Sequence, residues 1–499
     1  MDAEAIVIGS GFGGAVAALR LGEAGIRTLV LERGRRWDIT DPTTDATFST
    51  FQGLDKRAEW MNSVSRTPAY EGRPIEPYVG VLEIVEHGEY KFLVGSGVGG
   101  GSHAYGGILI APPRELWGDV FPAIPFDEME NTYFPRVIET IGASPIPDDI
   151  LDTPYYLGLK VFDRQAEKAG FPLAASTTNG MKDGRTRFMM GIDWEKVREE
   201  IAGKRVGSTI GAQFWFGQNS GAKQTLDQNY LKRAEETGAV EIRPLHLVRR
   251  IEAIDGGYRV GVDRIDETGS VQETVSLTCR SLFLAAGTLG TTEFLLRAKA
   301  RGDLPRLSDA VGEGLGNDGD TFTVRTNLPE TTNPHLGGPG AIVVMNYENP
   351  VYPCVMMRAP LPRFEQDFPK LDVMGTFIFT MTPHRGRMTL DPATDQLVLD
   401  FASDDLSKDA ARHLAERMAT ATGGVAGQPS SQITGHQLGG AGMGSVCDTA
   451  GRVNGHPGLY VVDGALVPGS STCVNPALTI AGLAERCMDQ ILATDLKRA

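Results

Sequence analysis

The sequence predicts an α/β fold in two lobes, and three stretches support this prediction. Residues 4–24, 281–298 and 459–492 each combine a short apolar run, a turn of small residues and apolar residues at helical spacing. Such strand–turn–helix units are typical of a sheet that is covered by helices. Segments such as 373–383 instead carry β-branched and aromatic runs bounded by Pro or Gly, which favours antiparallel strands in a second lobe.

Composition and charge limit the classes of function. The 499 residues are 41% hydrophobic and 22% charged, as in a globular chain with a large core. The formal net charge of -15 disfavours binding to nucleic acids. Because no apolar run reaches about 18 residues, we expect no membrane insertion. The eight histidines lack the spacing of a metal site, so no metal is expected.

The N-terminal segment and the cysteines favour a cytoplasmic protein. The first apolar run, residues 5–8, already belongs to a predicted strand, and no basic segment precedes it as in a signal peptide. The five cysteines are odd in number and scattered, which fits reduced thiols better than a disulfide framework.

The N-terminal unit carries a dinucleotide-binding pattern. Gly9-Ser10-Gly11-Phe12-Gly13-Gly14 matches G-x-G-x-x-G between a strand and a helix. In this pattern Gly9 permits a tight turn, Gly11 lets the backbone approach a pyrophosphate, and Gly14 allows close packing of helix and strand. Glu32 ends the next strand, where it can accept the ribose hydroxyls of an adenosine. The alternative is a Gly-rich turn in an ordinary α/β unit.

Later elements favour FAD over NAD. Seven of the fourteen residues 94–107 are glycine, which predicts close approach of the backbone to a ligand. The small-residue turn 285–287 follows a buried strand, and the strand near 459–462 ends in Asp463-Gly464. A helix then begins with Asn475 at its N-cap and Pro476 at its first position, so its positive dipole end would lie against a cofactor.

The motifs together resemble a known family. "VIGSGFGGAVAALRLGEAGIRTLVLERG", "VGSGVGGGS", "GAKQTLDQNYL", "GHQLGGAGMG" and "VNPALTIAGLAER" are similar to the glucose–methanol–choline (GMC) flavoprotein oxidoreductases, in particular the bacterial non-covalent cholesterol oxidase type. The resemblance implies non-covalent FAD, a Rossmann-like FAD-binding lobe, and a substrate lobe with a six-stranded antiparallel sheet and helices. We assign these residues to the cofactor site: Gly9, Gly11, Gly14, Glu32, Gly97, Gly100, Gly101, Ser102, Val248, Ala286, Gly287, Asp463, Gly464 and Pro476.

The resemblance also implies two catalytic residues. The family places a histidine in an H-x-L-G-G turn and an asparagine in V-N-P, and here these are His436 and Asn475. A histidine titrates near neutrality, so His436 can orient an alcohol hydroxyl or take its proton. Asn475 can hydrogen-bond the substrate oxygen. The alternative is a turn histidine satisfied by backbone groups.

The expected substrate pocket contains Tyr105, Met357 and Arg358, and Tyr105 and Met357 differ from the cholesterol oxidase pattern. The glutamate that shuttles a proton during steroid isomerisation falls on Met357, and Arg358 beside it is a poor base. We therefore expect no isomerisation of the usual kind, unless Glu348 or Glu365 supplies the carboxylate. Tyr105 replaces the family asparagine before G-G, which puts the sterol in doubt more than the oxidation.

The leading hypothesis is FAD-dependent oxidation of a secondary alcohol, a sterol or another cyclic metabolite, with O2 or another electron acceptor. The alternatives are a redox-neutral flavin-dependent isomerase or eliminase, and a non-catalytic FAD-binding protein. We expect a discontinuous FAD-binding domain and a substrate-binding domain. The first comprises residues 1–40, 80–115, 220–315 and 438–499, and the second comprises residues 41–79, 116–219 and 316–437. The segment 387–401 is expected to form a hairpin within the six-stranded sheet.

Overall fold

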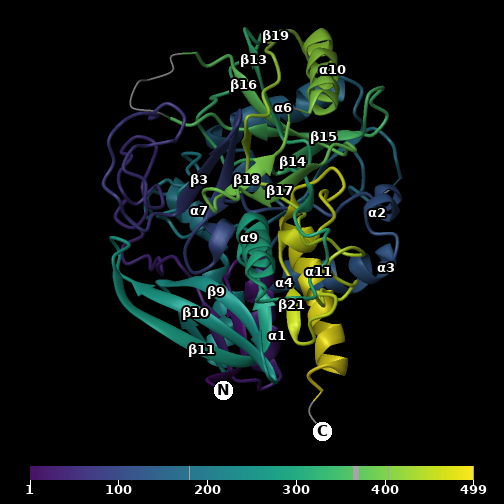
Figure 1. Ribbon diagram of the computed structural model, residues 1–499. Helices are drawn as coiled ribbons and strands as arrows, with labels where there is room; N and C mark the ends of the chain where they lie inside the picture. The colour runs from purple at the N-terminus through teal and green to yellow at the C-terminus, as the bar shows by residue number, and fades with distance from the viewer. Residues whose placement is uncertain (179, 364–369, 403, 498–499) are drawn as a thin grey trace.

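The computed structural model describes residues 1–178, 180–363, 370–402 and 404–497. Two large sheets organise the chain, and Figure 1 shows both termini at the end that holds the first sheet. Within the described residues, no helix is long and apolar enough to cross a membrane. The predicted α/β class is confirmed.

The first sheet has seven strands in the order β8-β2-β1-β11-β10-β9, with β21 beside β11. Its parallel part joins β8, β2, β1, β11 and β21, while β9 and β10 form an antiparallel meander with β11. The strands are β1 (Ala3–Ile8), β2 (Thr28–Leu31), β8 (Val240–Arg243), β9 (His246–Ile254), β10 (Gly257–Ile265), β11 (Val271–Leu284) and β21 (Leu459–Val461).

Helices pack against this sheet because their apolar faces are buried in one large core. The helices are α1 (Phe12–Glu23), α4 (Phe134–Ile141), α8 (Tyr230–Glu236), α9 (Gly287–Arg301) and α11 (Pro476–Thr494). α1 lies against both α8 and α11. The close fit of α1 needs glycine. A Cβ at Gly13 would lie 1.9 Å from the carbonyl oxygen of Val462, and one at Gly9 would lie 2.2 Å from that of Ala285.

The second sheet confirms the expected six antiparallel strands, in the order β19-β13-β16-β15-β14-β6. The strands are β6 (Gly184–Arg187), β13 (Thr321–Thr326), β14 (Ile342–Asn346), β15 (Cys354–Ala359), β16 (Met374–Thr380) and β19 (Val425–Ala426). α6 (Leu157–Lys168) and α10 (Asp405–Thr422) cover it, at the end of the molecule opposite the termini (Figure 1).

The hairpin expected at 387–401 forms, but its predicted place in the six-stranded sheet is wrong. β17 (Gly386–Leu390) and β18 (Leu397–Asp400) pair with β12 (Glu313–Leu315) in a separate three-stranded sheet. The physical reason is packing. Met388 and Leu399 are buried against Tyr90, Phe92 and Leu289, which come from β4 and α9. The alternation of apolar and polar residues at 387–401 predicted the hairpin. It did not indicate which core its apolar face would pack against.

Smaller elements connect the lobes. β3 (Leu82–His87) and β4 (Tyr90–Gly95) form a hairpin that pairs with β20 (Ile433–Thr434), and β5 (Ile108–Leu109) pairs with β7 (Met189–Met190). The remaining helices are α2 (Arg114–Val120), α3 (Phe126–Glu128), α5 (Asp148–Leu151) and α7 (Trp194–Ile201). The short helical turns are η1 (Gly100–His103), η2 (Met129–Tyr133), η3 (Pro154–Tyr156), η4 (Leu226–Gln228) and η5 (Gly464–Leu466).

A buried carboxylate joins the helices of the first lobe. Glu485 of α11 is fully buried and accepts two hydrogen bonds from Arg20 of α1, at 2.7 and 2.8 Å. Tyr230 of α8 donates to the same carboxylate at 2.8 Å, and Arg136 of α4 lies 3.3 Å from it. Because removal of one partner leaves an uncompensated buried charge, this cluster should be sensitive to substitution.

We expect Glu485→Gln to lower the free energy of unfolding by about 3 kcal/mol, since Arg20 would keep its charge without its buried partner. Denaturant unfolding followed by circular dichroism measures the change. The control is Asp149→Asn, which breaks an exposed ion pair with Arg198 and should cost less than about 1 kcal/mol. Equal effects of the two variants would contradict this assignment.

Candidate active site

Backbone pairing places His436 beside the Gly-rich segment. Thr434 of β20 pairs with Phe92 of β4, which leads directly into residues 95–103. The side chain of Gln437 donates to the carbonyl of Leu93 at 3.0 Å. This side-chain hydrogen bond ties the turn that carries His436 to β4.

An aspartate that the sequence analysis missed binds His436. The Nδ1 atom of His436 lies 2.6 Å from Oδ1 of Asp320, and Thr434 donates to the other carboxylate oxygen at 2.7 Å. The His436 side chain is 21% exposed and that of Asp320 is 9% exposed. Burial disfavours the imidazolium. The charge and hydrogen bond of Asp320, with a smaller contribution from Asp318, outweigh burial and raise the pKa of His436 above its ordinary value.

Asp318 ties the site to the segment that precedes Asn475. Its carboxylate accepts hydrogen bonds from the backbone N–H and hydroxyl of Ser471, both at 2.6 Å, and from the hydroxyl of Ser470 at 3.1 Å. Burial raises the pKa of Asp318 to about 6, although the bonds from Ser471 and the charge of His436 act in the opposite direction. The pattern G-N-D-G-D at 316–320 was the available signal for both acids, and it matched no motif used above.

Asn475 occupies the N-cap of α11, as predicted, but its side chain makes no capping hydrogen bond. Its Nδ2 lies 3.4 Å from Nε2 of His436. Its Oδ1 is buried and has no hydrogen-bond partner in the described part of the chain. A buried polar atom without a partner is costly, so this pair of side chains is arranged for a ligand with hydrogen-bonding groups.

The Gly-rich turns fit the phosphate-bearing part of FAD. A Cβ at Gly100 would lie 2.7 Å from the Cα of Gly11, so the two turns pack backbone to backbone. A Cβ at Gly11 or Gly101 would meet no atom within 4 Å, which leaves open space beside both. The N-terminus of α1 follows Gly11 and supplies unpaired N–H groups and a positive dipole end. These features suit a pyrophosphate.

Asp463 lies where two cofactor-site turns meet. Its carboxylate accepts from the N–H of Gly287 at 2.9 Å, from the hydroxyl of Thr291 at 2.6 Å and from the N–H of Ala465 at 3.0 Å. Burial raises the pKa of Asp463 to about 6 against the effect of these bonds. Asp463 thereby joins the turn 285–287 to Gly464. Pro476 is the first residue of α11, as expected.

Glu32 and Val248 lie farther along the expected cofactor site. Oε1 and Oε2 of Glu32 accept from the N–H groups of Gly34, Gly97 and Ser10 and from the Ser10 hydroxyl. These bonds link the end of β2 to the Gly-rich segment, so a ribose hydroxyl would share or replace one of them. Val248 is buried on β9 opposite Val262. Ser102 is buried and bonds to the N–H of Leu226 at 3.0 Å.

The three predicted pocket residues do not converge on one point. Tyr105 donates to the carbonyl of Gln224 at 2.7 Å, and its ring lies 5.4 Å from that of Phe12, beside the N-terminal Gly-rich turn. Met357 is fully buried in the core of the second lobe. Arg358 donates to backbone carbonyls of the 333–336 loop, the shortest bond being 2.8 Å to Leu336.

Of the two alternative glutamates, the structure describes only Glu348, which is not in the site. Glu348 is exposed, beyond the end of β14. Glu365 lies outside the described residues. Within those residues, no group of three or more His, Cys, Asp or Glu side chains is arranged to hold a metal ion.

Known proteins resemble this chain in sequence and in fold. A family model described as GMC oxidoreductase matches residues 383–484, and one described as FAD binding domain matches residues 4–61. Over these segments the chain is similar to the GMC oxidoreductases. It is 26% identical to a cholesterol oxidase of Mycobacterium tuberculosis, over 97% of this chain and 90% of that protein. It is also 26% identical to a cholesterol oxidase of Acinetobacter baumannii, over 99% and 95% of the two chains.

Solved structures support the fold. Pyridoxine 4-oxidase from Mesorbium loti matches with a TM-score of 0.68 at 17% identity and covers 100% of both chains. A fungal aryl-alcohol oxidase matches with a TM-score of 0.66 at 15% identity, over 99% of this chain and 100% of that one. The family-model matches, together with the cholesterol oxidases, indicate an FAD-dependent oxidoreductase that is similar to the GMC family, with FAD as its cofactor.

Replacing Asp320 by Asn should lower the pKa of His436, because burial then acts without the opposing carboxylate charge. If neutral His436 is the base, the acid side of the pH–rate profile moves to lower pH in the variant. The rate at high pH falls by about tenfold, since a less basic imidazole accepts a proton less readily. Single-turnover flavin reduction measured against pH tests this.

Asp119→Asn is the matched control, because Asp119 is exposed on α2. The acid limb of the pH–rate profile should move in Asp320→Asn and stay in place in Asp119→Asn. Any other combination would contradict the Asp320–His436 pair as the source of the raised pKa of His436.

Proposed function

We propose that this protein oxidises a secondary alcohol to a ketone, with His436 and Asn475 as the groups that bind the reacting hydroxyl. The observation that carries the proposal is the approach of His436 Nε2 to Asn475 Nδ2, 3.4 Å apart at the N-terminus of α11. The two relatives described above are cholesterol oxidases, and two structural matches are named for oxidation of pyridoxine and of aryl alcohols. Their shared chemistry is oxidation at a hydroxyl group.

Asp320, His436 and Asn475 have separate roles in the proposed reaction. Asp320 accepts a hydrogen bond from Nδ1 of His436, which leaves Nε2 as the acceptor that faces Asn475. The hydroxyl proton of the substrate passes to this nitrogen, and Asn475 holds the substrate oxygen. Bound FAD would accept the hydride that leaves the carbon bearing this hydroxyl group. Proton transfer to a positioned base typically contributes about 10²–10⁴-fold to the rate.

The proposal also covers how the protein binds FAD and substrate. The FAD is non-covalent and lies along the Gly-rich turns, Glu32, Val248, Asp463 and the start of α11. The domains keep the boundaries given above, with the first sheet in the FAD-binding domain and the six-stranded sheet in the substrate-binding domain. The substrate is a sterol or another cyclic alcohol, and O2 or another acceptor reoxidises the cofactor.

An anaerobic titration with a panel of alcohols, a 3β-hydroxysteroid included, tests the oxidation. We expect one alcohol class to bleach the visible flavin band of the holoenzyme. His436→Ala should slow bleaching by about 10²–10⁴-fold while FAD stays bound. His413→Ala, at an exposed position on α10, is the matched control. Bound FAD that no alcohol reduces, or bleaching that survives loss of His436, would overturn the proposal.

A second measurement concerns isomerisation. Met357 carries no ionisable group and is packed in the core, so a steroid Δ5-3-ketone should leave the enzyme with its double bond unmoved. Ultraviolet spectra of the product test this, because movement of the double bond into conjugation creates a strong new absorption band. Appearance of that band at the rate of oxidation would show that another residue moves the proton.

A further inference from the structure

A cavity of about 560 Å³ lies on the far side of the Gly-rich segment from the N-terminal Gly-rich turn. The direction of two neighbouring glycines shows this. The missing Cβ of Gly100 points at Gly11, whereas that of Gly99 points at Oγ of Ser102, Nε2 of His103 and Oδ1 of Asp227. His103 and Asp227 line the cavity, and none of the lining residues belongs to the cofactor or catalytic positions assigned above. A volume in this range suits a small organic ligand.

The charge of the cavity contrasts with that of the chain. Its lining contains five cationic side chains, from Arg36, Lys196, Arg205, Lys223 and Lys232, and two acidic ones, from Asp38 and Asp227, whereas the whole chain carries a net charge of -15. Arg36 and Arg205 are paired with Glu235 and Glu199, and Lys196 lies 3.5 Å from Asp193. Exposed Lys232 has no carboxylate partner among the described residues. Three of the five basic side chains are paired and burial lowers the pKa of Lys223, so Lys232 is the cation at the rim that is left for an anion.

Buried polar atoms at the cavity lack partners. His103 is 1% exposed and its Nε2 bonds to the carbonyl of Val98 at 2.8 Å, but its Nδ1 has no partner in the described chain. The same holds for Oδ1 of Asp227 and for Nε1 of Trp37, which is 3% exposed. Buried polar groups in native proteins are normally satisfied by protein, water or ligand. Three such atoms around one cavity are therefore an argument for an occupant with hydrogen-bonding groups.

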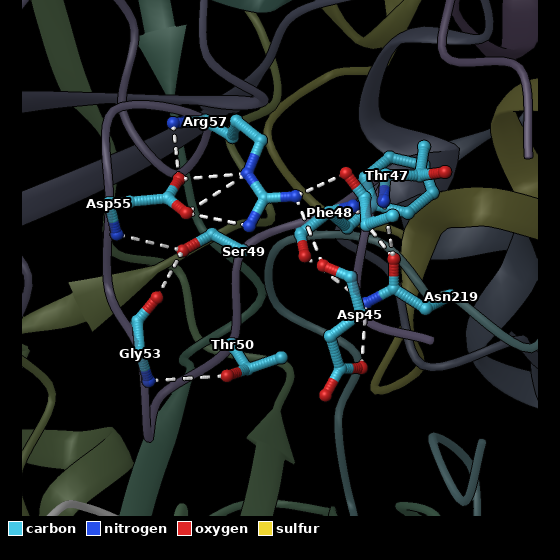
Figure 2. A network of polar contacts seen from close by, with 10 residues as sticks. Asp45, Thr47, Phe48, Ser49, Thr50, Gly53, Asp55, Arg57 and Asn219 are labelled. Carbon is cyan, nitrogen blue, oxygen red and sulfur yellow. Dashed lines mark hydrogen bonds and ion pairs between the residues drawn. The ribbon is translucent and has the colours of Figure 1, made fainter. Parts of the chain in front are cut away.

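One wall of the cavity is aromatic. Phe48 lies between Trp37 and His103, with ring centroids 5.4 and 5.7 Å away. Figure 2 shows how Phe48 is held. Oδ1 of Asn219 accepts from its N–H at 2.7 Å, while Nδ2 of Asn219 donates to its carbonyl at 3.1 Å and to Asp45 at 3.0 Å. Arg57 extends the network to Asp55. These hydrogen bonds fix the position of Phe48 in the aromatic wall.

Lys223 connects the cavity to the Gly-rich segment. Its ammonium group is buried and donates to the backbone carbonyls of His103, Tyr105 and Phe214. Asp227 is the acidic group that acts on it, and burial lowers the pKa of Lys223. An anion in the cavity would favour the charged form of this lysine and the hydrogen bonds that hold residues 103–105.

We propose that this cavity binds a small molecule that combines a flat ring with an anionic group, as a mononucleotide does. The ring lies against the wall formed by Trp37, Phe48 and His103, because flat π-systems pack favourably on aromatic side chains. The anionic group is bound by Lys232 and the neighbouring cations at the rim, and Asp227 accepts a hydrogen bond from a hydroxyl or amino group of the ligand. The site is separate from the FAD site and from the proposed reaction.

Isothermal titration of the FAD-loaded enzyme with AMP, adenosine and inorganic phosphate tests the proposal. AMP should bind with one site per chain, without release of FAD, and more tightly than adenosine or phosphate. The affinity should fall with added salt, as expected for a charge interaction at a rim. Equal affinity for phosphate and AMP, or for adenosine and AMP, would overturn the requirement for ring and anion together.

Variants locate the site. Lys232→Glu should weaken AMP binding by about tenfold or more, which corresponds to about 1.4 kcal/mol. Lys182→Glu, which changes the net charge equally at an exposed position outside the cavity, should leave it unchanged. Trp37→Phe keeps the ring, removes the unpartnered N–H and should weaken binding less than Lys232→Glu. Displacement of FAD by AMP, or absence of saturable binding at millimolar concentrations, would overturn the proposal.

Discussion

Backbone-to-backbone contact at the Gly-rich turns is the constraint on which the rest of this structure depends. Four chain segments meet there: the turn after β1, the end of β11, the end of β21, and residues 97–101. The approach is too close for any side chain, since a Cβ at Gly13 would lie 1.9 Å from the carbonyl of Val462. The contact brings the start of α1 against residues 97–101, and the open space beside Gly11 and Gly101 suits the pyrophosphate of FAD.

The second organising feature is a buried, charged environment behind His436. Asp320 and Asp318 are both buried, and the first binds Nδ1 of the histidine while the second binds Ser470 and Ser471. The two acids therefore fix the histidine from one side and the segment before Asn475 from the other. Buried carboxylates cost free energy unless hydrogen bonds satisfy them. Here the same hydrogen bonds that satisfy the acids also set the positions of the two side chains proposed to bind substrate.

The Gly-rich segment also separates two regions with different chemistry. Its open side, at Gly11 and Gly101, suits the cofactor, whereas its other side is packed by His103 and held by Lys223. Because one short segment forms part of both walls, its rigidity matters on both sides. Lys223, at the centre of three backbone carbonyls, provides that rigidity through its three hydrogen bonds.

Whereas the family resemblance supplied the choice of His436 and Asn475, local pattern in the sequence determined the α/β class, the N-terminal Gly-rich turn and the helix that begins at Pro476. These features follow from short-range requirements, namely glycine at crowded or open backbone positions, helical periodicity and the caps of helices. The tertiary structure alone decided three others: the partner of the 387–401 hairpin, the burial of Met357 in a core, and the hydrogen bond between Asp320 and His436, 116 positions apart in the chain. Each depends on which surfaces meet after folding, and the alternation of apolar residues along one strand does not encode that choice.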